Sequence, residues 1–428
     1  MEINSFLSRH VGPKPEEVNK MLACIGVSSL DELIDQTIPS KIRLKEPLSV
    51  GDAMSEHAYL NHIKSLAQKN KIFKTYIGMG YYNTITPAVI LRNILENPGW
   101  YTSYTPYQAE ISQGRLEALL MYQTMISDMT KLPLANASLL DEATSAAEAM
   151  IMFFNARSRE MQKNGANQFF VSENVFPQTL SVMQTRAKAL NIEIIVGNHE
   201  NFTFTNKVFG VFIQYPDQWG EVKDYSDFVA KSKANGSFIL VASDLMALAL
   251  LTPPGEWGAD CVVGSSQRFG LPMGFGGPTT GFFACKEDFK RQMPGRIIGI
   301  TIDAQGKRAL RMALQTREQH IKREKATSNI CTASALMAIM SGMYAAYHGQ
   351  KGIANIAMRI NRITAVLNQE IQKLGYKQFN TYFFDTLCIQ SPVKTDVIRK
   401  IAEENKINFR YICDECIGIS IDETTTLD

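Results

Sequence analysis

Short apolar segments alternate with helical segments from about residue 135 onward, and this alternation limits the possible folds more than any other feature of the chain. Stretches with helical character, such as 179–190 and 224–234, separate most of the apolar runs. Strands joined by helices favour right-handed crossovers and a mostly parallel sheet that is buried on both faces. The strands expected on this basis are 169–172, 193–196, 211–215, 238–242, 261–264 and 281–285.

The segments on either side of this sheet predict two further parts. Before it the patterns are helical, with Pro15 at the start of one helix, Gly26 at its end, and Ser29 and Glu32 as a capping box for the next. After it, beyond a long helix that starts near residue 330, short helices and strands alternate in a small α+β unit. Its expected elements are helices 352–374 and 394–405 and strands 383–389, 408–412 and 418–421.

We therefore predict an N-terminal helical arm (1–95), a large α/β domain (96–345) and a small α+β domain (346–428). A helix packed on the last strands would normally follow in such a unit. The small domain is thus expected to be truncated, which leaves open whether the natural product ends near Asp428 or continues.

Composition excludes several classes of partner. A chain of 428 residues with 45% hydrophobic residues can bury a large core, and its net charge of +2 gives no reason to expect nucleic acid or an acidic membrane surface. No apolar run approaches the ~20 residues needed to cross a bilayer, and the first residues lack the features of a signal peptide. We expect a cytoplasmic protein.

The seven cysteines are an odd number and predict reduced thiols, with Cys24, Cys261, Cys285 and Cys388 in apolar surroundings. The motif 413–416 is a CxxC, but it has no second pair, and its two central acidic residues raise the pKa of thiols. We expect neither metal binding nor redox use of this motif.

The six histidines are scattered. His57 and His62 are five positions apart, which is off the i, i+4 spacing that places two ligands on one helix face. We therefore expect no metal site.

A glycine-rich segment, 264–278, directly follows an expected core strand. By itself it fits a plain turn between strands. It also resembles the turn of pyridoxal-phosphate enzymes of the aspartate-aminotransferase fold, in which a lysine after a short core strand holds the cofactor as a Schiff base. The lysine position falls on Gln267, whose amide cannot form an imine. On this interpretation the chain has the frame of such an enzyme without its chemistry.

Two more features map to the carboxyl edge of the expected sheet, where ligands of open α/β folds bind. The run 139–148 opens an Ala-rich helix whose N-terminus could bind a phosphate, but Glu142 would repel it, and a capped helix packed on the sheet is the alternative. Asp244 follows strand 238–242, where this fold places the partner of the pyridine nitrogen.

Two surface segments complete the set of candidates. The tyrosine-rich loop 101–114 has a central proline and suits either an interface, the edge of an active site or ordinary aromatic packing. The segment 317–325 carries five basic or potentially basic side chains with glutamates between them. It fits a solvated helix face with ion pairs or a docking patch for an acidic partner.

Six motifs, in order, closely resemble the P protein family of the glycine cleavage system, glycine dehydrogenase (decarboxylating). They are 6–13, 104–114, 264–278, 293–296, 315–321 and 422–426, and the resemblance covers nearly the whole chain. It implies the pyridoxal-phosphate-dependent transferase fold (aspartate-aminotransferase type) and the N-terminal half of the family's protein. In that family two homologous halves pair, in one polypeptide or as two subunits, and the C-terminal half holds the Schiff-base lysine.

The implied reaction is the decarboxylation of glycine on pyridoxal phosphate, with transfer of the aminomethyl group to the lipoyl arm of the H protein. This chain would be the pseudo-catalytic half, with Gln267 at the lysine position, and the cofactor would be held by the partner half. By the same resemblance Tyr104, Tyr107 and Gln108 are expected to face the partner's cofactor. Asn329 and Thr332 are expected to reach its phosphate.

Related halves can have glycine where this chain has Glu142, which argues against a cofactor bound by this half. The isolated chain is expected to be inactive and to self-associate through the face that the second half would cover. Two alternatives stay open. A complete enzyme would need lysine in place of Gln267, and a scaffold or regulatory half would only stabilise the catalytic half.

Overall fold

The computed structural model describes residues 12–46, 48–102, 105–317, 319–326, 328, 330 and 333–427. Among the predicted site residues, Tyr104, Asn329 and Thr332 lie outside this part of the chain. The chain divides into two compact units, Met1–Phe73 and Lys74–Asp428. The predicted divisions after residues 95 and 345 stay predictions.

The first unit contains three helices among its described residues: α2 (Pro15–Ile25), α3 (Leu30–Thr37) and α4 (Glu56–Ala67). Gly26 ends α2 in the left-handed region, at φ 87°, as its sequence position predicts. Ser29 caps α3 by accepting a hydrogen bond from the amide of Glu32. The reciprocal half of the expected capping box differs, because the Glu32 carboxylate accepts from the amide and hydroxyl of Ser28.

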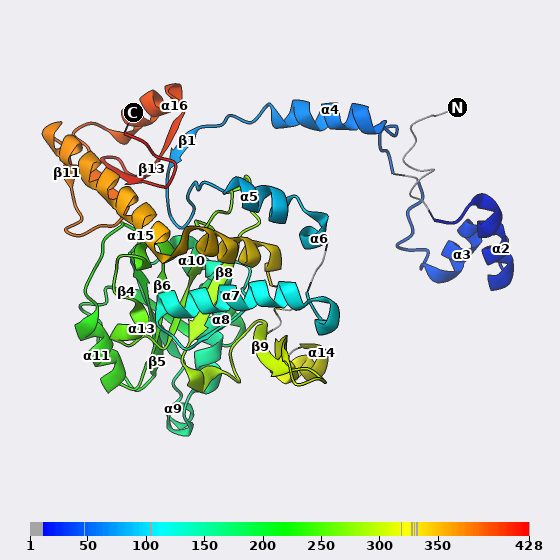
Figure 1. The fold of residues 1–428 in the computed structure, drawn as a ribbon, viewed down its shortest axis with the longest axis horizontal. Helices are drawn as coiled ribbons and strands as arrows, with labels where there is room; N and C mark the ends of the chain where they lie inside the picture. The colour runs from blue at the N-terminus through cyan, green and yellow to red at the C-terminus, as the bar shows by residue number, and fades with distance from the viewer. Residues whose placement is uncertain are drawn as a thin grey trace. The chain divides into compact units, whose positions relative to one another are not determined.

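The second unit is built around a seven-stranded sheet with the order β2-β8-β7-β6-β5-β3-β4 (Figure 1). Strands β3 to β7 are parallel to one another, β8 is antiparallel to β7, and the edge strand β2 is antiparallel to β8. All of the strands expected for this sheet are present, and only the short β2 was missed. Their bounds are β2 (Leu134–Ala135), β3 (Gln168–Ser172), β4 (Glu193–Gly197), β5 (Val208–Tyr215), β6 (Phe238–Ser243), β7 (Cys261–Ser265) and β8 (Gly281–Cys285).

Two hydrophobic cores cover the two faces of this sheet, because successive side chains of a strand point to opposite faces. On β6, Leu240 and Ala242 belong to the core beneath α8 (Glu142–Ala156) and α10 (Pro177–Ala189). Ile239 and Val241 belong to the other core. That core is covered by α7 (Gln113–Thr130), α11 (Ser226–Ala234) and α15 (Ala335–Lys373).

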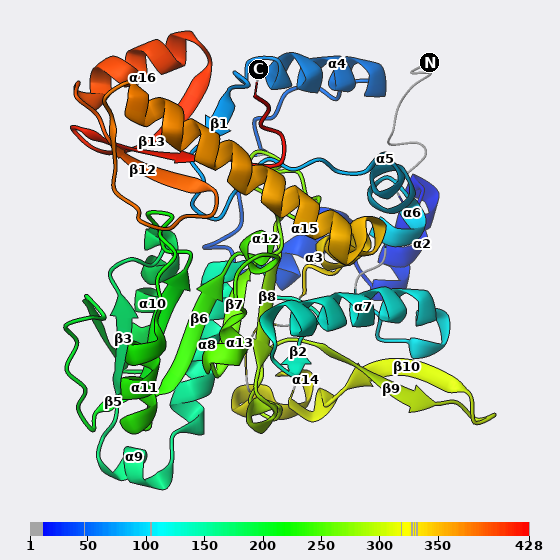
Figure 2. The same cartoon turned by 60° about the vertical axis from the view of Figure 1, so that its left-hand side comes forward.

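The C-terminal part forms a second sheet with the order β1-β13-β14-β12-β11. Its elements are β1 (Lys74–Tyr76), β11 (Lys377–Gln378), β12 (Thr386–Gln390), α16 (Thr395–Glu404), β13 (Ile407–Cys413) and β14 (Cys416–Ser420). The helix and strands predicted here are confirmed, but the addition of β1 parallel to β13 was not foreseen. Helix α15 runs from this sheet toward α7 and is kinked at Gly349, where φ is 62° (Figure 2).

The remaining elements connect these layers. A separate two-stranded ribbon, β9 (Ile297–Ile302) with β10 (Arg308–Ala313), was also missed by the sequence analysis. The short helices are α5 (Ala88–Ile90), a π-helical turn (Leu91–Leu95), α6 (Pro98–Tyr101), a 3-10 turn (Ala109–Ile111), α9 (Arg159–Lys163), α12 (Leu245–Leu248), α13 (Pro254–Trp257) and α14 (Gln319–Lys322). No helix in the described residues is long and apolar enough to cross a membrane.

Candidate functional site

Gln267 lies in the turn after β7, and its side-chain amide forms hydrogen bonds with backbone groups of two loops. The side chain is 1% exposed. Its Nε2 donates to the carbonyl oxygens of Tyr82 (2.8 Å) and Leu271 (2.6 Å), and its Oε1 accepts from the amide of Tyr82 (3.0 Å). Both N–H donors and one acceptor site are therefore satisfied within the chain. This residue joins the loop before α5 to the glycine-rich turn and offers no reactive group.

Arg268, the next residue, lies at the centre of a buried charge cluster. Its Nη1 is 2.5 Å from Oδ2 of Asp244 and 2.5 Å from Oδ2 of Asp385. Burial alone would lower the pKa of this guanidinium, but the two carboxylates raise the pKa above its ordinary value. Burial raises the pKa of Asp385, and the charge of Arg268 opposes that shift. The guanidinium also lies 3.7 Å from the ring centroid of Tyr82.

Asp244 is at the position where the resemblance places the partner of a pyridine nitrogen, but both of its oxygens are engaged elsewhere. Oδ1 caps α12 by accepting from the amides of Met246 (2.7 Å) and Ala247 (3.2 Å). Oδ2 pairs with Arg268. This carboxylate thus fixes the end of β6 and neutralises an arginine of the same chain.

Glu142 is the first residue of α8 and lies close to the same cluster. Its carboxylate accepts a hydrogen bond from Oγ1 of Thr179 at 3.1 Å. Burial raises its pKa to about 7, and the nearby charges of Asp244 and Asp141 act in the same direction. Asp141 caps the helix through the amide of Thr144. Two carboxyl groups therefore occupy the helix N-terminus that could otherwise bind a phosphate.

The space between these groups is a polar cavity of about 30 Å³. It has room for only a few water molecules, whereas cofactor sites occupy several hundred cubic ångströms. Its lining includes Gln214, Asp217, Ser243 and Arg410 besides the cluster itself. Burial raises the pKa of Asp217 to about 6. Within the described residues, Oε1 of Gln214, Oδ2 of Asp217 and Oγ of Ser243 have no hydrogen-bond partner.

These residues do not fit pyridoxal phosphate. An imine cannot form at Gln267, the Asp244 carboxylate is already paired, and Glu142 stands at the phosphate end. A second cavity of about 170 Å³ lies at the N-terminus of α8 and shares Glu142 and Ser265 with the first, and each is smaller than a usual cofactor site. The interpretation of 264–278 as a cofactor turn that lacks its chemistry stays a prediction.

Of the other predicted site residues, the structure describes Tyr107 and Gln108. Tyr107 is 48% exposed, and its hydroxyl accepts a hydrogen bond from Nη2 of Arg296 at 2.7 Å. Gln108 is exposed at the start of the turn Ala109–Ile111. Arg296 was not among the predicted site residues, although its motif 293–296 was part of the resemblance. The described residues 321–325 of the basic segment are exposed, which fits both a solvated helix face and a docking patch.

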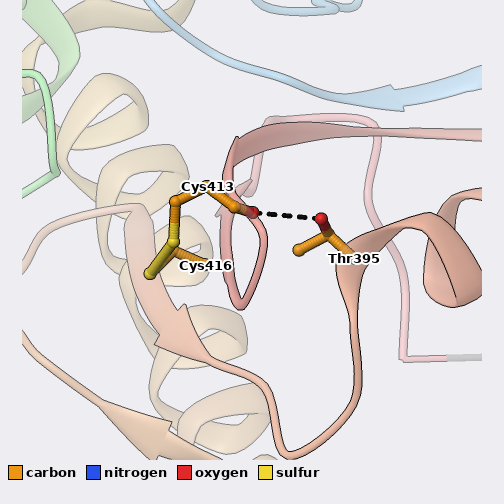
Figure 3. The surroundings of a disulfide bond; sticks show 3 residues. All are labelled: Thr395, Cys413 and Cys416. Carbon is orange, nitrogen blue, oxygen red and sulfur yellow. Dashed lines mark hydrogen bonds between the residues drawn. A yellow bond between two sulfur atoms is a disulfide. The ribbon is translucent and has the colours of Figure 1, made fainter.

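The expectation of reduced thiols is wrong for the CxxC motif, because Cys413 and Cys416 form a disulfide (Figure 3). Strands β13 and β14 are joined by a two-residue turn, which places the cysteines opposite each other with their Cα atoms 4.8 Å apart. Oγ1 of Thr395 donates to the carbonyl oxygen of Cys413 at 3.0 Å. Cys24 is exposed rather than in apolar surroundings, whereas Cys261, Cys285 and Cys388 are buried as expected.

The sequence model of the glycine cleavage system P-protein matches residues 8–428. The chain belongs to this family. Three relatives named glycine dehydrogenase (decarboxylating) are 54% identical to it in Flavobacterium johnsoniae, 56% in Nostoc sp. and 56% in Bacteroides thetaiotaomicron. The alignments include 100% of this chain but 43–45% of the relatives. The chain thus spans less than half the length of these curated relatives.

Solved structures agree on the fold. The crystal structure of glycine decarboxylase (P-protein) of the glycine cleavage system, in inhibitor-bound form, has a TM-score of 0.87 and 30% identity, over 98% of this chain and 96% of that one. An alanine–glyoxylate aminotransferase from Nostoc sp. has a TM-score of 0.55 and 13% identity, over 90% of this chain and 93% of that one. The latter likeness shows the fold alone, and the predicted pyridoxal-phosphate-dependent transferase fold is confirmed.

Proposed function

We propose that this P-protein chain is the N-terminal, pseudo-catalytic half of glycine dehydrogenase (decarboxylating). The assembled enzyme would decarboxylate glycine and pass the aminomethyl group to the lipoyl arm of the H protein. The observation that supports the assignment is Gln267, whose amide bonds the backbone of Tyr82 and Leu271 and which the resemblance places at the position of the Schiff-base lysine. The membership of the P-protein family and the greater length of the relatives support a second half.

In this proposal the second half holds pyridoxal phosphate, which supplies the electron sink for decarboxylation. The present chain would contribute residues that line that site. Tyr107, oriented by Arg296, and Gln108 would face the partner's cofactor, as would Tyr104. Asn329 and Thr332 would reach its phosphate. The cluster around Arg268 contributes stability rather than chemistry.

The test compares the isolated chain with the assembled two-half protein. With pyridoxal phosphate and borohydride, the isolated chain should keep its mass, and it should not decarboxylate glycine. The assembled protein should do so in the presence of lipoylated H protein. A stable cofactor adduct on a lysine of this chain, or turnover by the chain alone, would overturn the assignment.

A scaffold that only stabilises the catalytic half is the second candidate, and the pairing of Gln267 and Arg268 within the chain favours it. The two candidate functions predict different results for a Tyr107 variant. If this half takes part in catalysis, removal of the Tyr107 hydroxyl lowers turnover, whereas turnover is unchanged if the half is only a scaffold.

A further inference from the structure

The ribbon formed by β9 and β10 is a two-stranded sheet separate from the two larger sheets. Its strands pair from Ile297↔Ala313 to Ile302↔Arg308, and Asp303 closes the turn by accepting hydrogen bonds from the amides of Gln305 and Lys307. Figure 2 shows the turn end of the ribbon beyond the end of α7. An isolated two-stranded ribbon is marginally stable in water and has two open edges.

Helix α7 holds the base of the ribbon at both edges through two glutamines. Gln123 accepts a hydrogen bond from the amide of Ile298 (2.7 Å) and donates to its carbonyl oxygen (3.1 Å). Gln113 does the same for Leu310, at 2.9 Å in both directions. Each amide side chain thus takes the place of a neighbouring strand. The base of the ribbon is therefore fixed relative to the helix.

The apolar face of the ribbon is longer than the part that this chain covers. Ile298, Ile300 and Ile302 alternate along β9 and share one face. Ile298 is 3% exposed, but Ile300 is 63% and Ile302 is 72% exposed. Ile111, two residues before Gln113, is 79% exposed. We call Ile111, Ile300 and Ile302 the ribbon patch.

Arg308 is opposite Ile302 and shares its face of the ribbon, whereas Arg311 is opposite Gly299 and lies on the other face. Glu110, the neighbour of Ile111, is exposed as well, so the charges next to the patch have both signs. A partner for this patch therefore needs an apolar centre with charged residues of both signs around it.

We propose that the ribbon patch is covered by the second half of the P-protein, with Ile300 and Ile302 as buried anchors of that interface. This inference rests on the proposed function. The chain aligns over its full length with relatives of which it spans 43–45%, so the second half is a partner of sufficient size. Apolar anchors at the centre and charges at the edge are the usual arrangement of a specific interface.

The experiment uses the chain co-expressed with the second half from the same source. The variants are I300E and I302E, and the matched control is I401E on α16, where the parent side chain is 55% exposed. I300E and I302E should weaken pairing by at least about tenfold, since a buried anchor contributes on this scale. I401E should pair as the parent does. All three isolated variants should unfold at the parent temperature, because these side chains are exposed within the chain.

Hydrogen exchange gives a second readout: amides of residues 300–302 should exchange more slowly in the pair than in the isolated chain. Unchanged pairing of I300E and I302E, or no association of the parent halves, would overturn the proposal. The isolated parent chain could also form a dimer that the I300E substitution dissociates. That result would assign the patch to a second copy of this chain and would overturn the proposal as well. Glycine decarboxylation is assayed on the same samples. A pair that assembles through the ribbon but lacks activity counts against the proposed function alone.

Discussion

Arg268 lies 2.5 Å from Asp244, so this carboxylate, which the resemblance places opposite a pyridine nitrogen, is already paired within the chain. The same guanidinium nitrogen bonds Asp385 at the start of β12, so one arginine joins the seven-stranded sheet to the C-terminal sheet. A cationic side chain of the chain itself is thus the charge partner of Asp244.

Removal of this arginine should destabilise the chain strongly. R268M leaves Asp244 and Asp385 buried without a counter-charge, which typically costs about 3–5 kcal/mol of the free energy of unfolding. Urea denaturation at pH 7.5 measures the loss. The control is K373M, which breaks an exposed pair with Glu370 and should change stability little. A loss for R268M no larger than that for K373M would show that the cluster is not a stabilising element.

Restoring the lysine should not restore the chemistry. Q267K removes the hydrogen bonds to the backbone of Tyr82 and Leu271 and places an ammonium beside a cavity of about 30 Å³. We expect a less stable chain with no absorbance at the Schiff-base band after addition of pyridoxal phosphate. Borohydride reduction followed by mass measurement checks this. An adduct at position 267 would show that the site still accepts the cofactor.

Stability should fall as the pH rises toward 7, because of Glu142. Burial raises its pKa in the folded chain to about 7, above the value near 4.3 in the unfolded chain. The folded chain therefore binds more protons between these values, and its free energy of unfolding decreases with pH by up to about 4 kcal/mol. Above pH 7 this contribution is constant.

The variant E142Q should lose that part of the pH dependence and be more stable than the parent at pH 8. Urea denaturation from pH 4.5 to 8 gives both curves, and E117Q, at an exposed position on α7, is the control. Parallel curves for the parent and E142Q would contradict the assignment of Glu142.

The disulfide at the end of the β13–β14 hairpin should contribute modestly to stability. It closes a loop of only four residues, for which the chain-entropy relation gives about 2 kcal/mol. C413S and C416S should each lower the free energy of unfolding by up to this amount under oxidising conditions and match the parent in excess reductant. Alkylation before and after reduction counts the thiols. Alkylation of both cysteines without reduction would show that the bond does not form.

The fold was predictable from the sequence where a strand is long enough to show its own pattern. Strands β3 to β8 are short apolar runs, most of them separated by helices, and all were expected. Strand β1 has only three residues. In ribbon strand β9, Ile297 and Ile298 are buried at the end that α7 holds, whereas Ile300 and Ile302 are exposed, so its burial depends on contacts distant in sequence.

Residues of the candidate site could be predicted from the sequence, but their contacts could not. The missing lysine at Gln267 is visible in the sequence, and so is Glu142. The partners of these residues are not: Gln267 bonds Tyr82 across 185 positions, and Arg268 bonds Asp385 across 117. No local periodicity encodes such contacts, because they arise only when the two sheets pack.

The hydroxyl of Tyr107 tests whether this half takes part in catalysis. It accepts a hydrogen bond from Arg296, and the residue is exposed where a second half could meet it. Y107F removes the hydroxyl and little packing area, so folding and pairing of the assembled enzyme should survive. Loss of a hydrogen bond to a charged group costs on the order of 1.5–3 kcal/mol, or roughly ten- to over a hundredfold in turnover.

Decarboxylation of glycine by the assembled enzyme is measured together with cofactor occupancy, so that lost binding is separated from lost turnover. Y101F, in the same tyrosine-rich loop at a comparable exposure of 51%, is the matched control and should keep the parent rate. Y104F is expected to behave as Y107F does. If Y107F and Y104F turn over glycine at the parent rate with full cofactor occupancy, the loop only supports the structure, and the scaffold interpretation holds.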